Sequence, residues 1–147
     1  MSSLGEKIKK LRKIKKVTQR QTANAINVTE RNYQAYEADT QKPSFDSLLA
    51  LSKFFDVPSD YLIGAGLYGQ LEEYPNLKQI LCEQLEKAYG SFLYGQFHLP
   101  PLGEMDEIPF VTIASALVNN VSIYQDDNGV VYSITLNSLP NSDEDLS

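Results

Sequence analysis

The stretch that decides the fold of the first half of the chain is Thr18–Glu37, with the sequence TQRQTANAINVTERNYQAYE. Thr18 and Gln21 have the spacing of a capping box, in which two side chains satisfy free N–H groups at a helix start. Asn27 is expected to end this helix, because asparagine tolerates the left-handed backbone conformation better than most residues. Thr29 is placed to cap the next helix. The sequence therefore predicts two helices joined by a turn so short that they must cross steeply.

Further short helices are expected on both sides of this pair. Before it, Leu4, Ile8 and Leu11 recur at helical spacing, and the other faces carry mostly basic residues: Lys7, Lys10, Arg12 and Lys13. After it, Pro43-Ser44 opens a helix whose apolar residues supply much of the core: Leu48, Leu49, Leu51, Phe54 and Phe55. A fifth helix follows Pro58-Ser59 and ends at Gly64. Residues 1–64 are therefore predicted to form a compact all-α domain.

Charge divides the chain into two parts. Residues 1–64 hold 11 Lys and Arg against 7 Asp and Glu, whereas residues 65–147 hold 2 against 12, which together give the formal charge of −6. Such asymmetry is typical of nucleic-acid-binding proteins, although a lysine-rich helix can also be simply a solvated face. The lysine-rich start of the chain is therefore a candidate surface for a polyanion.

Several classes of protein are not favoured by the composition. No apolar run approaches the length of a membrane span, so no membrane partner is expected. The single Cys82 cannot form an internal disulfide, which fits a reducing cytoplasm. One cysteine and one histidine leave no ligand set for a structural zinc site, and no nucleophile–base pair or phosphate loop is visible. We therefore expect a cytoplasmic protein that is not an enzyme and has no metal or cofactor.

The second half is expected to be separate from the first. Glycines cluster around residues 65–70, which predicts a linker. The elements expected beyond it are a helix over 71–89, an irregular stretch over 91–105, a helix capped by Asp106, and a β-hairpin made of Val121–Gln125 and Val130–Leu136. The helix capped by Asp106 is expected to face inward with Ile108, Val111, Ala114, Ser115 and Val118. Residues 71–140 would form an acidic dimerisation or regulatory domain, and 141–147 an acidic tail. The fold class is mainly α with a small α+β C-terminal part.

Residues 4–64 resemble the XRE/Cro family of phage-repressor-like helix-turn-helix proteins. The matching residues are Leu11-Arg12, Thr18-Gln19, Ala23, Val28-Thr29, Tyr36-Glu37, Pro43-Ser44, Leu48 and Val57–Gly64. The resemblance implies a five-helix, lambda-repressor-like DNA-binding domain whose recognition helix, Thr29–Glu37, enters the major groove. The chain departs from the family pattern at Thr22, where the family usually has leucine, and at Asn27 and Asp39, which replace glycines.

Roles in DNA binding can be assigned by side-chain chemistry. Arg31 can pair with guanine, Asn32 with adenine, and Glu30 with a cytosine amino group. The expected base-contacting residues are Thr29, Glu30, Arg31, Asn32, Gln34 and Ala35. The family pattern implies a phosphate contact from Gln19, and the further phosphate candidates are Thr18, Asn24, Lys42 and Lys16. It also implies that Arg12 and Glu37 form a structural ion pair. Tyr33 and Tyr36 are expected to pack in the core.

The function predicted from these features is a sequence-specific, DNA-binding transcriptional regulator. It would be a repressor of phage or mobile-element type that binds a palindromic operator in double-stranded DNA as a homodimer, joined through the C-terminal half. Two alternatives remain. One is an antitoxin-like regulator whose acidic half binds a partner protein. The other is a sensor that holds a small ligand or peptide near the aromatic residues Phe92, Tyr94 and Phe97.

Overall fold

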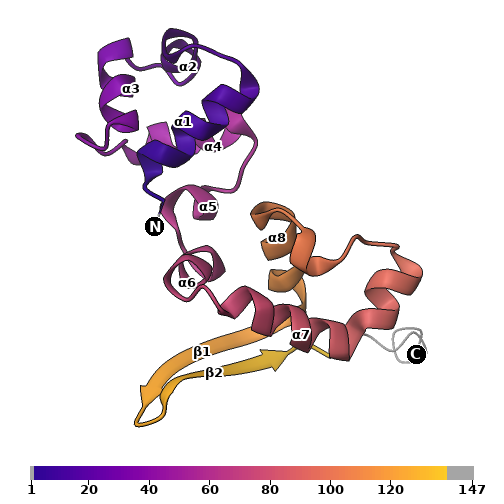
Figure 1. The fold of residues 1–147 in the computed structure, drawn as a ribbon. Helices are drawn as coiled ribbons and strands as arrows, with labels where there is room; N and C mark the ends of the chain where they lie inside the picture. The colour runs from indigo at the N-terminus through magenta and orange to yellow at the C-terminus, as the bar shows by residue number, and fades with distance from the viewer. Residues whose placement is uncertain (1, 139–147) are drawn as a thin grey trace, which may run out of the picture. The chain divides into compact units, whose positions relative to one another are not determined.

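The computed structural model describes residues 2–138, which fall into two compact units divided between Glu73 and Tyr74 (Figure 1). The units are mostly helical, and the second ends in a two-stranded antiparallel sheet. The mainly α fold class with a small α+β C-terminal part is confirmed. Among the described residues, no helix combines the length and the apolar character needed to cross a membrane.

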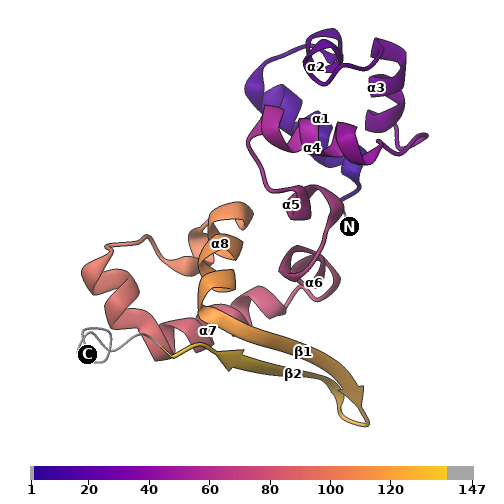
Figure 2. The ribbon, with the colours of Figure 1, turned by 180° about the vertical axis from the view of Figure 1, so that it is seen from behind.

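The first unit consists of six helices: α1 (Leu4–Lys15), α2 (Gln19–Ala25), α3 (Glu30–Glu37), α4 (Phe45–Phe55), α5 (Ser59–Ile63) and α6 (Leu67–Glu73). The predicted helix starts at Thr18, Thr29 and Ser44 are confirmed, because each side chain accepts a hydrogen bond from the backbone N–H three residues later. Figure 2 shows α2 and α3 together at one end of this unit. The two helices that decide the fold therefore form, and they do so at an outer surface.

The core of the first unit contains apolar side chains from all the predicted helices. Ile8, Ala23, Tyr33 and Leu51 are fully buried. The prediction that Leu49 belongs to this core is wrong, since its side chain is 38% exposed. Leu49 lies two positions before Leu51 on α4, and residues two apart on a helix do not share a face.

The turns at Asn27 and Asp39 take the left-handed backbone conformation, and the turn at Asp39 holds the start of α1 against the end of α3. Asn27 and Asp39, which replace the family's glycines, take φ values of 65° and 58°. The Asp39 carboxylate accepts a hydrogen bond from the Gly5 N–H at 2.9 Å. A Cβ atom on Gly5 would lie 2.7 Å from the Tyr36 carbonyl oxygen, which is too close for any side chain. Glycine at position 5 therefore allows the two backbones to touch.

Residues 65–70, expected to be a linker, instead contain the start of α6, and this helix belongs to the first unit. The rings of Tyr68 and Tyr61 pack edge to face with centroids 5.6 Å apart. Lys7, expected on the outer face of its helix, is 4% exposed; its Nζ donates to the Tyr61 carbonyl oxygen at 2.8 Å and lies 3.2 Å from Glu72 Oε1. A buried lysine and its counter-charge thus attach α6 to the helical domain.

The second unit begins with α7 (Leu77–Gly90), which continues into a π-helical segment, η1 (Ser91–Gln96). A short 3₁₀ turn, η2 (Leu102–Glu104), leads to α8 (Glu107–Leu117). Two predictions are corrected. The single helix expected over 71–89 is interrupted between α6 and α7, where Pro75 lacks the N–H that a helix needs. The stretch 91–105, expected to be irregular, is partly helical.

The core of the second unit lies between α7, η2 and α8. Leu77, Leu81, Leu85, Leu102 and Phe110 are at most 1% exposed. Val111 and Ala114 are buried as expected, whereas Ser115 is exposed and Val118 already belongs to the first strand. Asp106 precedes α8 without a side-chain capping bond.

The predicted hairpin forms from β1 (Val118–Asp126) and β2 (Gly129–Leu136). The strands pair in register from Asn120↔Thr135 to Asp126↔Gly129, which leaves Asp127 and Asn128 in the turn. A β-bulge lies between Val118 and Asn120. The predicted acidic tail, 141–147, lies outside the described residues.

Candidate nucleic-acid interface

Helix α3 has one face in the core and one face toward solvent. Tyr33 and Tyr36 are buried, and their rings pack edge to face with centroids 6.4 Å apart. Among the predicted base-contacting residues, Arg31 and Gln34 are exposed, and Asn32 and Ala35 are half-buried. The buried tyrosines therefore fix the helix so that its outward face carries a guanidinium and two amides.

The first turn of α3 is rigidly defined. The Thr29 hydroxyl oxygen accepts a hydrogen bond from the Asn32 N–H at 3.1 Å, and Glu30 is exposed beside it. The oxygen of Thr29 is thus used as a helix cap, while its own O–H remains a donor. This arrangement places Glu30, Arg31 and Asn32 at the start of an exposed helix, which is the part that reads base edges when such a helix enters the major groove.

The start of α2 presents the predicted phosphate contacts. The Thr18 N–H donates to the Gln21 side chain at 2.8 Å, and the Gln21 N–H donates to the Thr18 hydroxyl at 3.0 Å. Gln19 follows, half-buried, and its Nε2 donates to Glu37 Oε2 at 2.8 Å. The side-chain amide of Gln19 has two N–H groups, so this bond leaves one donor for a phosphate. Asn24, near the end of α2, is exposed.

Arg12 and Glu37, expected to pair, lie 2.8 Å apart between Arg12 Nε and Glu37 Oε1. Arg12 Nη1 also donates to the Val17 carbonyl oxygen at 3.1 Å. The Glu37 carboxylate raises the pKa of Arg12 above its ordinary value. Because Glu37 is 4% exposed and Arg12 15%, this pair joins α1 to α3 inside the domain and does not offer a free cation to DNA.

The Tyr33 hydroxyl is the one buried side-chain polar atom without a hydrogen-bond partner among residues 2–138. Burial is the main cause that raises its pKa well above the ordinary tyrosine value, and the nearby Glu37 charge acts in the same direction. Tyr33 therefore stays neutral in the folded domain and serves packing, as expected.

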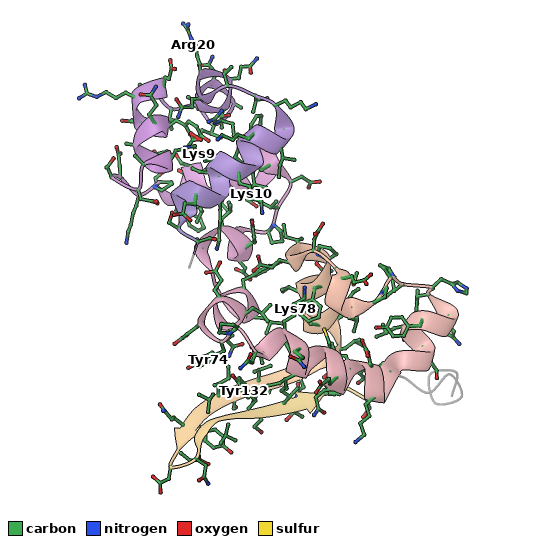
Figure 3. All side chains as sticks on the ribbon, viewed as in Figure 1. Lys9, Lys10, Arg20, Tyr74, Lys78 and Tyr132 are labelled. Carbon is green, nitrogen blue, oxygen red and sulfur yellow. The ribbon has the colours of Figure 1, made fainter. Side chains whose placement is uncertain are left out.

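The lysines of the first unit have different environments. Lys16 and Lys42, both phosphate candidates, are exposed, and Lys16 ends α1 in the left-handed conformation. Lys15 donates to the Phe54 carbonyl oxygen at 3.1 Å and lies over the Phe54 ring. Lys9 and Lys10 are exposed on α1 (Figure 3). Lys7 is buried, so the basic surface is smaller than the lysine count indicates.

Sequence reasoning missed Arg20 as a contact candidate. It is the second residue of α2, exposed, and it extends outward at the end of the domain formed by α2 and α3 (Figure 3). The available signal was its position in the first helical turn, directly after Thr18 and Gln19.

The aromatic residues Phe92, Tyr94 and Phe97, considered above as a ligand site, contact residues of the same part of the second unit. Phe92 and Phe97 pack edge to face with centroids 4.8 Å apart. The Tyr94 hydroxyl donates to Glu86 Oε1 at 2.9 Å and accepts from the Leu102 N–H at 3.2 Å. These contacts give the three rings a structural role in shaping the segment after α7.

Comparison with known proteins identifies relatives of this chain. A family described as a helix-turn-helix domain matches residues 5–65. The HTH-type transcriptional regulator ImmR of Bacillus subtilis (strain 168) is 30% identical over 121 residues, which covers 81% of this chain and 91% of ImmR. The cryptic phage CTXphi transcriptional repressor RstR of Vibrio cholerae is 39% identical over 57 residues, 39% of this chain and 51% of RstR.

Among solved structures, the P22 c2 repressor in complex with a synthetic operator is 29% identical, with a TM-score of 0.43, and the match covers 45% of this chain and all of that one. The extent of the match to ImmR, together with the helix-turn-helix match over residues 5–65, shows the family. The chain belongs to the XRE/Cro-type, phage-repressor-like helix-turn-helix family of transcriptional regulators.

Proposed function

We propose that the chain is a repressor that binds a palindromic operator in double-stranded DNA and reads base edges with α3. The observation that carries this proposal is the fixed outward face of α3, where Arg31 is exposed at the start of a helix held by buried Tyr33 and Tyr36. Arginine forms a bidentate pair with guanine, and Asn32 can do the same with adenine. Thr29, Glu30, Gln34 and Ala35 complete the proposed reading surface.

Phosphate contacts would set the position of α3 on the duplex. Thr18, Gln19, Asn24, Lys16 and Lys42 are the proposed residues, and all but the half-buried Gln19 are exposed. We add Arg20, which extends from the same end of the domain (Figure 3). Such contacts supply affinity without sequence information, so base specificity rests on α3.

Two copies of the domain are needed, because one such domain contacts few base pairs. In a dimer, the two α3 helices would enter successive major grooves, about 34 Å apart. The acidic second unit is the proposed dimerisation and regulatory domain, since its charge keeps it away from DNA. The protein would act in the cytoplasm through binding and not through catalysis.

Selection of bound duplexes from a random pool, with the full chain, tests this proposal. We expect enrichment of an inverted repeat whose half-sites are centred about one helical turn apart. Recovery of unrelated sequences with no shared pattern would contradict sequence-specific binding. A single unrepeated motif would contradict the dimer.

A further inference from the structure

The hairpin of the second unit has an apolar face that its own chain covers incompletely. Directly opposite residues of paired strands share a face, so Ile123 and Tyr132 lie on one face, together with the next-but-one residues Val130 and Ile134. The Tyr132 ring contacts the Tyr74 ring edge to face, with centroids 6.2 Å apart (Figure 3). Nevertheless, every residue of both strands is described, and none is buried.

The opposite face of the hairpin is mostly polar but also carries the pair Tyr124 and Val131, and Tyr124 is 55% exposed. Ser122 pairs with Ser133, and both are exposed; Asn120 and Thr135 are exposed on the same face. The difference in burial indicates the orientation of the sheet, because a half-buried antiparallel sheet places one face on a core. The first face is therefore the one that lies toward this unit's own core, and Ile123, Tyr132 and Ile134 are partly covered there.

The outer edge of β2 has the properties of an edge that hydrogen-bonds to a further strand. The sheet has two strands within residues 2–138, so β2 has no strand on its outer side. Its sequence, GVVYSITL, is rich in β-branched and aromatic residues and contains no charge and no proline. Natural proteins protect exposed edges with lysine, proline, bulges or short strands, and β2 has none of these devices. A two-stranded hairpin is also only marginally stable alone.

The edge of β1 is less suitable. A bulge between Val118 and Asn120 interrupts its register, and bulges hinder further pairing. The strand follows α8 without a break and ends in the charged Asp126.

The absence of charge on β2 and the symmetry of paired identical strands favour a second copy of the chain as the partner. The described part of this unit, residues 74–138, carries seven acidic residues and two lysines, yet β2 carries no charge. Pairing along β2 therefore brings no like-charged side chains of the paired strands into direct contact. An antiparallel pair of identical strands also satisfies two-fold symmetry, in which the same residues contact each other from both sides.

We propose that two copies of the chain join through β2, antiparallel across a two-fold axis, to form a four-stranded sheet with order β1-β2-β2-β1. The apolar faces of the two hairpins, with Tyr132 and Ile134 of each copy, become one continuous surface. This inference rests on the proposed function, because it names the surface that holds the repressor dimer. Its test does not depend on DNA.

Cysteine cross-linking of the full chain tests the arrangement. Single variants at five successive positions of β2, namely Val131→Cys, Tyr132→Cys, Ser133→Cys, Ile134→Cys and Thr135→Cys, place thiols on both faces of the strand, so that a two-fold axis through any of these residues is detected. Ser122→Cys is the matched control on β1. In the proposed sheet, a β2 residue near the axis lies about 5 Å from its copy, whereas Ser122 lies about 14 Å from its copy, too far for a disulfide. After mild oxidation, at least one β2 variant should form a covalent dimer, and Ser122→Cys should match the parent chain.

A charge variant gives a second readout. Ser133→Lys places two ammonium groups close to the axis, whereas Ser122→Lys adds the same charge three strand spacings apart. Sedimentation equilibrium should show a dimer dissociation constant about 1.5- to 5-fold higher for Ser133→Lys than for Ser122→Lys. Cross-linking of Ser122→Cys as strong as that of the β2 variants, or cross-linking of none of them, would overturn the inference.

The outcomes separate this inference from the proposed function. A chain that selects an inverted repeat but does not cross-link through β2 dimerises elsewhere, and only the inference fails. A chain that cross-links through β2 but selects no DNA keeps the dimer surface and loses the proposed function.

Discussion

Replacing Glu72 with alanine should loosen α6 from the first unit. The Lys7 side chain is 4% exposed, and its Nζ has three neighbours: Glu72 Oε1 at 3.2 Å, the Tyr61 carbonyl oxygen at 2.8 Å, and the Tyr61 ring, whose centroid is 5.2 Å away. The variant therefore leaves a buried ammonium with a hydrogen bond and an aromatic face but without its counter-charge, which is unfavourable.

The expected loss follows from the burial of the two partners. Removing one member of a buried pair costs about 3–5 kcal/mol, whereas an exposed pair contributes about 0–1 kcal/mol. Glu72 is 17% exposed, and Lys7 keeps two of its neighbours, so we expect an intermediate loss of about 1–3 kcal/mol. Amide hydrogen exchange on the full chain measures this locally, and protection in α1, α5 and α6 should fall by about 5- to 150-fold.

Glu73→Ala is the matched control, because Glu73 is the next residue of α6, carries the same charge and is exposed. It should leave exchange in α1 and α5 unchanged. Equal exchange in the two variants would refute the reasoning that the Lys7–Glu72 contact attaches α6 to the domain.

Three further predictions concern the first unit. Glu37→Ala should lower the free energy of unfolding by about 2–4 kcal/mol, because Arg12 and Gln19 both lose their acceptor. The double variant Glu37→Ala, Arg12→Ala should lose less stability than the sum of the two single losses. Additive losses in urea unfolding would contradict the pairing. Folding raises the pKa of Tyr33, so the stability that the neutral Tyr33 side chain contributes is present below its unfolded pKa near 10 and is lost as the pH rises further. Above this pH, circular dichroism should show that Tyr33→Phe unfolds less readily than the parent chain. Identical alkaline unfolding profiles would count against a buried neutral phenol. Operator affinity should fall steeply with salt, with a log–log slope of about −0.9 for each phosphate neutralised, and a flat titration would exclude the proposed phosphate contacts.

Local signals in the sequence predicted most of the first unit. Thr18, Thr29 and Ser44 cap helices because their side chains accept bonds from the free N–H groups of the first turn, a requirement that depends on a few adjacent residues. The turns at Asn27 and at Asp127-Asn128 could likewise be predicted from adjacent residues alone. The inward positions of Tyr33 and Tyr36 follow from helical spacing alone.

The errors in the prediction came from contacts between residues far apart in sequence. Lys7 has the helical spacing of a core position, but its charge predicts exposure unless the distant Glu72 is known to lie beside it. The glycines at 64–69 indicated a linker, yet Gly69 instead lets α6 approach the Gly64 carbonyl oxygen, where a Cβ would collide. The outward face of α3 could be predicted, whereas the Gln19–Glu37 contact that occupies one Gln19 donor could not.

The most direct test of the account is the binding of Arg31→Ala to the selected operator and to a random duplex. We expect the variant to lose about 1–3 kcal/mol per half-site on the operator, to relax the base preference at one position, and to bind the random duplex almost as the parent does. Lys42→Ala is the control, because loss of a phosphate contact should weaken both duplexes alike. Unchanged affinity of Arg31→Ala for both duplexes would contradict base reading by α3.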